Sequence, residues 1–280
     1  MLTQYIRVLY SDDGTITDRS LANADRTATI PFEVVAAEDY LYVGQYFTFG
    51  NLFFNIDTAN SNSSALSIDY WTGNKWVSAV DVLDGTSSSG VSIAQSGVVQ
   101  WSTDKDESGW QRVSDPTDEE TALGFTSLKI YDLYWIRISF SADFSASTDL
   151  LQIGYKFCTD ADVSVLAPDI NDYLTTWGVS DWTLQILEAS KQVVADLKAR
   201  NIIGHSGQLI RFDDINIPTA YKTLAIIYDG LGGQDFREMR NEMEVKYREL
   251  IGKAPIIVDD NKDLRQNSGE TGLDHGRVYR

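Results

Sequence analysis

The pattern of hydrophobic and polar positions changes near residue 165 of this chain. Before it, apolar residues alternate with polar ones in short runs separated by Gly, Asp, Asn and Ser, which is typical of strands and turns. After it, apolar residues recur every three or four positions, which is typical of amphipathic helices. From about Pro255 the chain is polar with neither pattern. We therefore expect an α+β multidomain protein, with a β-domain at 1–165, a helical domain at 166–253 and an extended tail at 254–280.

The first region is predicted to form an antiparallel β-sandwich or jelly roll, because its short strands are regularly spaced and rich in aromatic and β-branched residues. The expected strands cover residues 4–10, 29–34, 42–49, 51–56, 65–71, 97–101, 134–140 and 150–157. Within 134–140, alternation places Tyr134, Ile136, Ile138 and Phe140 on one face of the sheet. Turn-forming residues at 72–75 predict a hairpin that resumes at Trp76.

The tryptophans of this region favour a packed core. Trp71, Trp101 and Trp135 lie within apolar alternations and are expected to be buried. Trp76 and Trp110 lie near turns, so their burial is not predicted. The segments YWTGNKW at 70–76, SGVVQW at 96–101 and YWIRI at 134–138 resemble a jelly-roll module common in phage tail proteins and bacterial surface proteins. The resemblance covers about 70 residues and implies a fold more than a function.

The second region predicts a short helix and then a long one. Asp169 follows Pro168 and would cap a short helix that ends at Gly178. Ser180 or Asp181 would cap a long helix over 181–200. The apolar stripe of the long helix consists of Trp182, Ile186, Ala189, Val193 and Leu197.

Two further helices are predicted before residue 253. One begins near Pro218, which suits the first turn of a helix, and ends at Gly232-Gly233. The other begins at Asp235, where Glu238 three residues later suggests a capping box, and closes at Gly252. Helices joined by short loops can pack into a small bundle.

The order and character of these helices resemble head–tail connector proteins of tailed bacteriophages, also called adaptor or head-completion proteins. The residues that carry the resemblance are 181–200, the run PTAYKTLA at 218–225, and 236–250. It covers about 85 residues and rests on helical pattern. The large β-region in front is a departure, because many small connectors lack one.

The resemblance implies a structural protein of the virion neck, made in the bacterial host cytoplasm. Such connectors form a homo-oligomeric ring, commonly of twelve copies, on the portal protein, and they offer a platform to a tail or collar protein. The ring extends the channel through which DNA passes without specific binding. The predicted subunit contact uses the helices at 181–200 and 235–250, and a closed ring requires two different faces on each subunit.

A second interpretation starts from the β-region. Exposed aromatic residues on a sandwich can stack on sugar rings, so the alternative is a carbohydrate- or receptor-binding module of a phage tail or baseplate. An exposed aromatic pair on one sheet face would favour this alternative. A tail baseplate component would combine both domain types.

The charge of the chain is strongly acidic and uneven. The net charge is −18, and residues 1–165 hold 9 Lys+Arg against 23 Asp+Glu. An acidic surface repels nucleic acid and anionic lipid. The charge is therefore interpreted either as a means of keeping the protein soluble or as the lining of a channel through which DNA passes without binding. We expect no membrane contact, because no signal peptide and no apolar run of about 20 residues is present. The single cysteine, Cys158, allows no intrachain disulfide and is expected to be a buried apolar group.

The sequence predicts no enzyme, no cofactor and no metal. His205 and His275 lie far apart, and no cluster of His, Cys and carboxylate residues has zinc spacing. Gly230-Leu231-Gly232-Gly233 lacks the Lys of a phosphate loop, and no nucleophile elbow is present. Asp213-Asp214 is interpreted as a turn before a helix.

The C-terminal tail is predicted to bind a partner. Pro255 stops the helix, and Ile256, Ile257 and Val258 would add a strand or fill a groove on that partner. The expected partner-binding residues farther along are Leu264, Val278, Tyr279 and Arg280. Because 259–274 has little apolar surface, contacts must be continuous to offset the ordering entropy of about 1–2 kcal/mol per residue.

Overall fold

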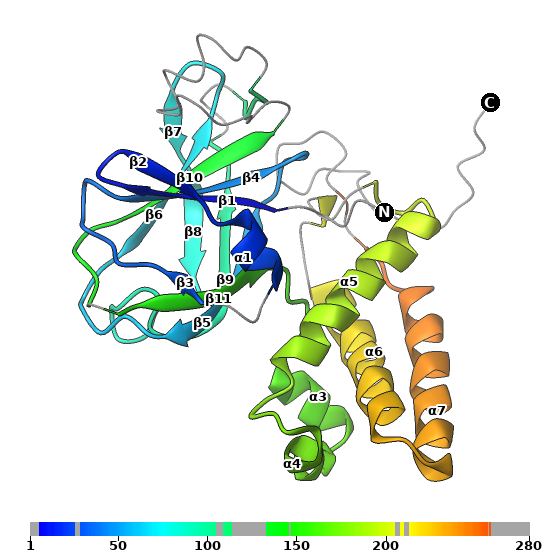
Figure 1. Cartoon of the computed structure of the whole chain (residues 1–280). Helices are drawn as coiled ribbons and strands as arrows, with labels where there is room; N and C mark the ends of the chain where they lie inside the picture. The colour runs from blue at the N-terminus through cyan, green and yellow to red at the C-terminus, as the bar shows by residue number, and fades with distance from the viewer. Residues whose placement is uncertain are drawn as a thin grey trace, which may run out of the picture. The chain divides into compact units, whose positions relative to one another are not determined.

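The chain forms two compact units that divide after Gly154. The computed structural model describes residues 6–25, 29–104, 109–113, 133–145, 147–204, 208–209, 213–256 and 258 of the 280-residue chain. The division falls before the expected boundary at residue 165, because a helix that the sequence pattern did not predict, α3 (Asp160–Leu166), belongs to the second unit (Figure 1). Each unit is described by itself below.

The first unit contains two antiparallel sheets, which confirms the predicted sandwich-like α+β class. The six-stranded sheet has the order β2 (Thr15–Asp18), β1 (Arg7–Asp12), β4 (Tyr40–Gln45), β10 (Tyr134–Phe140), β6 (Leu66–Trp71) and β7 (Trp76–Ser78). The five-stranded sheet has the order β3 (Ile30–Pro31), β11 (Asp149–Gly154), β5 (Asn51–Thr58), β9 (Gly97–Ser102) and β8 (Val80–Asp84). A short helix, α1 (Ser20–Asp25), follows β2.

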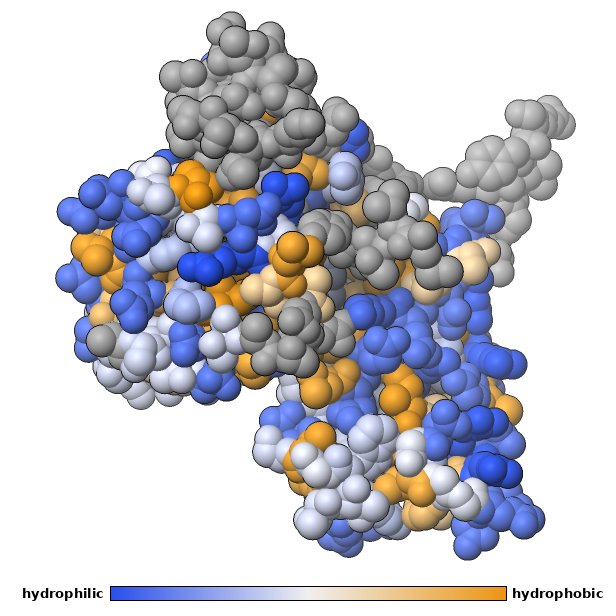
Figure 2. All heavy atoms as spheres, viewed as in Figure 1, coloured by the Kyte–Doolittle hydropathy of each residue, from blue (hydrophilic) through white to orange (hydrophobic). Residues whose placement is uncertain are grey.

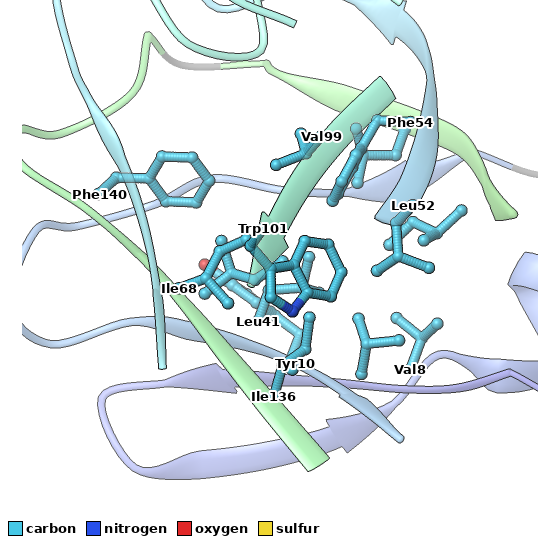
Figure 3. Close-up of a cluster of buried hydrophobic side chains, with 14 of the residues drawn as sticks. Val8, Tyr10, Leu41, Leu52, Phe54, Ile68, Val99, Trp101, Ile136 and Phe140 are labelled. Carbon is cyan, nitrogen blue, oxygen red and sulfur yellow. The ribbon is translucent and has the colours of Figure 1, made fainter. Parts of the chain in front are cut away.

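The main core lies between the inner faces of the two sheets. Side chains from both sheets meet there, including Val8, Leu41, Ile68 and Ile136 from one sheet and Leu52, Phe54, Val99 and Trp101 from the other (Figure 3). The prediction for β10 is confirmed, because Tyr134, Ile136, Ile138 and Phe140 are all buried in this cluster. Period-2 alternation therefore identifies which face of each strand points inward.

A second cluster covers part of the outer face of the six-stranded sheet. Trp71 and Trp135 are fully buried there. The ring of Trp135 lies over Gly44 on the neighbouring strand, where a Cβ atom would come within 2.8 Å of the ring. The predicted burial of Trp71, Trp101 and Trp135 is thus confirmed.

The two tryptophans that the sequence left open differ from one another. Trp110 is buried and donates a hydrogen bond of 3.0 Å from its indole N–H to the Trp135 carbonyl. Trp76 is only partly buried, and it stands opposite Trp71 in the predicted hairpin of β6 and β7. The hairpin turn is closed by the Thr72 hydroxyl, which donates to the Lys75 carbonyl at 2.9 Å.

The second unit is helical. Its elements are α3, the 3-10 turn η1 (Ile170–Tyr173), α4 (Leu174–Trp177), α5 (Thr183–Ala199), α6 (Asp213–Leu231) and α7 (Gln234–Ile251). Helices α6 and α7 run side by side, and α5 packs on α6 at an oblique angle (Figure 1). The predicted stop at Gly178 is confirmed, because this residue adopts the left-handed conformation with φ 68° and caps α4.

Three predicted helix starts are wrong. The N-cap of α5 is Trp182, although the Asp181 carboxylate accepts a hydrogen bond of 2.8 Å from the Thr183 N–H. Helix α6 begins at Asp213, so Pro218 lies inside the helix and not in its first turn. Helix α7 has Gly233 as its N-cap with no side-chain cap, so no capping box begins at Asp235. In each case the first helical residue differs from the one that capping preferences predict. Capping preferences alone therefore do not set the helix boundary.

Helix α3 begins with a capping box that was not predicted from the sequence. The Thr159 hydroxyl accepts from the Asp162 N–H at 3.2 Å, and the Asp162 carboxylate accepts from the Thr159 N–H at 2.7 Å. Asp takes the place of the usual Glu or Gln at the third position of this motif. The Thr-x-x-Asp pattern at residues 159–162 is the sequence feature from which this helix start could be predicted.

The segment after α7 folds back into its own unit. Ile256 is 0% exposed and Val258 is 4% exposed, and both pack in a cluster with residues of α5 and α7. Val258 also forms an antiparallel bridge with Leu209. The prediction that Ile256 and Val258 bind a partner is therefore wrong, because their side chains fill the core of the helical unit. The other predicted partner-binding residues, Ile257, Leu264, Val278, Tyr279 and Arg280, lie outside the described residues.

Candidate interaction surfaces

The helical unit carries a groove of about 520 Å³. Helix α6 supplies its apolar floor through Ala225 and Ile226, and α5 contributes Gln192. Asp229 of α6 also lines the groove, and α7 supplies the remaining wall with Arg240, Asn241, Glu244, Val245 and Arg248. We call this feature the α7 groove. The structure thus brings the two helices predicted at a subunit contact, α5 and α7, to one concave surface.

Charges on α7 are segregated around the helix. Residues spaced by three, four or seven positions share a side, so Arg237, Arg240 and Arg248 lie on the side toward the groove. Four acidic residues have a different helical phase and lie away from it: Asp235, Glu238, Glu242 and Glu249. Glu244 shares the side of the arginines, and together with Asp229 of α6 it balances Arg240 and Arg248 in the groove lining.

Two ion pairs and a buried tyrosine hold α7 against the other helices. Arg240 pairs with Asp229 of α6 at 2.8 Å, and Lys222 of α6 pairs with Glu244 at 2.5 Å. The Tyr247 hydroxyl donates to Asp196 of α5 at 2.6 Å. Burial, with a further contribution from Asp196, raises the pKa of Tyr247 above its ordinary value. These contacts join α7 to both α5 and α6.

Apolar side chains stand exposed along the same helix. Val245 is 64% exposed at the groove, and Met239 is 43% exposed. Figure 2 shows that the visible face of the helical unit is largely hydrophilic, with separate hydrophobic side chains among the polar ones. Isolated exposed apolar residues need no explanation, but one at the rim of a groove with an apolar floor provides a contact point for a protein partner.

The outer face of the six-stranded sheet carries a polar row next to the buried tryptophans. Tyr42, Arg137, Asp69 and Ser78 stand opposite one another in register across β4, β10, β6 and β7. Arg137 donates to Asp69 at 2.6 and 3.2 Å, and the Ser78 hydroxyl donates to the same carboxylate at 2.9 Å. Burial raises the pKa of Tyr42 to about 12, which keeps its hydroxyl neutral.

Aromatic rings enclose the arginine of this row. The Arg137 guanidinium lies 4.8 Å from the centre of the Tyr40 ring and 5.1 Å from that of Trp76. Both rings are half-buried and share the outer face of the sheet. The arrangement combines planar apolar surface with a charged pair and hydroxyls, which is the chemistry that sugar recognition uses. We call Tyr40, Trp76, Arg137 and Asp69 the aromatic–arginine cluster.

Other candidate chemistry is structural in the described parts of the chain. Cys158 is buried, and burial raises the pKa of its thiol to about 12, so the thiol is protonated and unreactive at neutral pH. Over the residues that the structure describes, no group of three or more His, Cys, Asp or Glu side chains is arranged to hold a metal ion. Within the same residues, no helix has the length and apolar character to cross a membrane. His205 and His275 lie outside the described residues.

Comparisons with known proteins give no identification. No protein-family model matches the chain, and neither the curated proteins nor the solved structures contain a significant match.

Proposed function

We propose that this protein is a structural component of a bacteriophage neck, which assembles as a ring between the portal and the tail. The observation that carries the proposal is the α7 groove, where an apolar floor and the exposed Val245 lie among charged side chains of both signs. A preformed concave surface made by three long helices suits lateral packing between subunits. The resemblance of residues 169–253 to head–tail connectors points to the same role.

The charge of the molecule is consistent with this proposal. A net charge of −18 gives a surface that repels the phosphate backbone, so DNA would pass a ring of such subunits without being held. The proposed partners are further copies of this chain, a portal protein and a tail or collar protein. The proposed site is the virion neck, and no catalytic step is assigned to the protein.

The test is the mass of the purified full chain, alone and mixed with a portal protein. Native mass spectrometry and negative-stain microscopy should show a closed ring, with twelve copies expected from the resemblance, either alone or on the portal. Sedimentation at rising salt should then report the electrostatic part of the contact. A chain that stays monomeric in both samples at concentrations of about 100 μM contradicts the proposal, because subunit interfaces of ordinary size associate well below that level.

A second candidate function, saccharide binding, is favoured by the aromatic–arginine cluster on the sandwich unit. Tyr40 and Trp76 are half-buried on one sheet face, which is less exposure than the exposed aromatic pair expected for the carbohydrate-binding alternative. A glycan array followed by calorimetric titration would test it, with Trp76→Ala as the disabling variant. The matched control is Trp110→Phe, because Trp110 is buried in the core and presents no ring to solvent. Binding that survives Trp76→Ala, or no binding to any glycan, excludes this function.

A further inference from the structure

The helical unit has an acidic, partly apolar edge whose chemistry is opposite to that of the α7 groove. Along α3 and η1, Ala161, Val165, Asp169 and Asp172 are exposed, and Val165 is 77% exposed. We call these four residues the α3–η1 edge. Its apolar members, Ala161 and Val165, are four positions apart and share one side of α3.

The acidic residues of this edge lack cationic neighbours. Asp160, at the start of α3, pairs with Lys156 at 3.3 Å, but Asp169 and Asp172 form no ion pair with any other described residue. Most acidic residues of the long helices are paired internally, for example Glu244 with Lys222 and Glu249 with Lys253. The carboxylates of the edge are therefore available to a cation from outside.

The groove side of α7 has arginines in the same situation. Arg237 is exposed and forms no ion pair within the described residues, and Arg248 reaches Glu244 only at 3.8 Å with a side chain that is 75% exposed. Arg237 shares the side of α7 that lines the groove, where Ile226 and Val245 supply apolar surface. The two carboxylates of the lining, Asp229 and Glu244, are paired with Arg240 and Lys222. The charges without a close partner are thus cationic beside the groove and anionic at the α3–η1 edge.

We propose that the α7 groove of one copy receives the α3–η1 edge of a second copy of this chain. Val165 would enter the groove over Ile226 and beside Val245, and Asp169 and Asp172 would face Arg237 and Arg248. Two different faces of each subunit are used, which makes the contact heterologous and lets copies follow one another around a ring. The inference rests on the proposed ring function and specifies which surfaces build it.

Charge reversal of each face tests the contact. Arg237→Glu with Arg248→Glu should weaken self-association by about tenfold or more, and Asp169→Arg with Asp172→Arg should do the same, because each apposes like charges. An equimolar mixture of the two double variants should recover the association, since the reversed groove then meets the reversed edge. Matched controls are Lys191→Glu and Asp57→Lys, which reverse exposed charges elsewhere and should leave association unchanged.

A cross-linking experiment keeps the test informative even if a charge variant folds poorly. Val165→Cys and Val245→Cys place thiols at two exposed positions, and the native Cys158 is buried. Under mild oxidation, a mixture of the two single variants should form a disulfide-linked heterodimer, and neither variant alone should form one efficiently. If the wild type forms a ring but the reversals leave it intact and no heterodimer forms, the contact is wrong and the ring function stands. If the wild type stays monomeric alone and with a portal, both fail.

Discussion

Replacing Ile256 with alanine should destabilise the helical unit strongly. Ile256 is 0% exposed and packs with Tyr247 and Ile251 of α7 and with Val193 and Leu197 of α5. The substitution removes three buried carbons, which at about 0.8 kcal/mol per buried methylene gives about 2.4 kcal/mol from transfer alone. A residual cavity adds to this value, so the expected loss of unfolding free energy is about 2–4 kcal/mol.

The magnitude is measurable by urea unfolding of the full chain, followed by the helical circular dichroism signal. The unfolding midpoint should fall with little change in the slope, because the surface exposed on unfolding is nearly the same in both proteins. Val245→Ala is the matched control, since it shortens an apolar side chain that is 64% exposed and should shift the free energy by no more than about 0.5 kcal/mol.

A loss below about 1 kcal/mol for Ile256→Ala would refute the reasoning, because a fully enclosed isoleucine cannot be shortened at so small a cost. Such a result would mean that the segment after α7 is released from its unit in solution. It would also revive the expectation from the sequence that Ile256 is available to a partner.

Three further predictions concern buried or crowded positions. Cys158→Ala should reduce the alkaline sensitivity of the helical unit: the pKa of the buried thiol is raised from 9.0 to about 12, so its contribution is complete below pH 9 and is lost as pH rises toward 12. The free energy of unfolding, measured in urea at about pH 8 and about pH 10.5, should fall less in the variant, by up to about 1.4 kcal/mol per pH unit. Gly44→Ala should cost about 1–3 kcal/mol in thermal unfolding of the sandwich unit, because its Cβ would lie 2.8 Å from the Trp135 ring; an unchanged melting temperature contradicts this packing. Arg137→Met should lower the free energy of unfolding in urea by about 1–2 kcal/mol, because it leaves the half-buried Asp69 without its ion-pair partner. Adding Asp69→Asn should lower it little further. Additive losses would show that the two side chains do not act as a pair.

The strands of the first unit were predictable because one face of each sheet is buried. Alternation gave β5, β6, β9 and β10 nearly at their observed bounds, and it identified the buried face of β10. The expected strand at 29–34 was longer than the observed β3 (Ile30–Pro31). Proline has no backbone N–H to donate, so Pro31 limits the pairing of that strand in a way that alternation does not show.

The positions of the long helices were predictable from periodicity, whereas their starts and the short helix α3 were not. The stripe of α5 is buried as expected, but the preferred cap residues at the starts of α6 and α7 did not mark their first turns. Pro218 is tolerated within α6 despite its missing N–H, and Gly233 caps α7 through its backbone alone. Capping preferences are worth about 1 kcal/mol, so tertiary packing easily moves a helix start by a turn.

The candidate surfaces were only partly visible in the sequence. The helical stripe of α7 predicted an exposed charged side, but the groove exists only because α6 places an apolar floor beside that side. The row of Tyr42, Arg137, Asp69 and Ser78 joins β4, β10 and the β6–β7 hairpin, which are far apart in the chain. Strand register, which one sequence does not specify, therefore creates it.

The segment after α7 shows why burial must be assigned from the whole fold. Apolar residues after a helix-stopping proline indicate that the chain will cover some apolar surface, but not whose surface it is. Here Phe157, Leu209 and the ends of α5 and α7 leave a site in the same unit, and Ile256 and Val258 fill it. A chain end that completes its own core gains this burial without the translational entropy cost of association, so the intramolecular site wins wherever the geometry allows it. Partner binding by the helical unit is therefore better sought at the α7 groove, whose apolar floor and arginines no described segment of the chain covers.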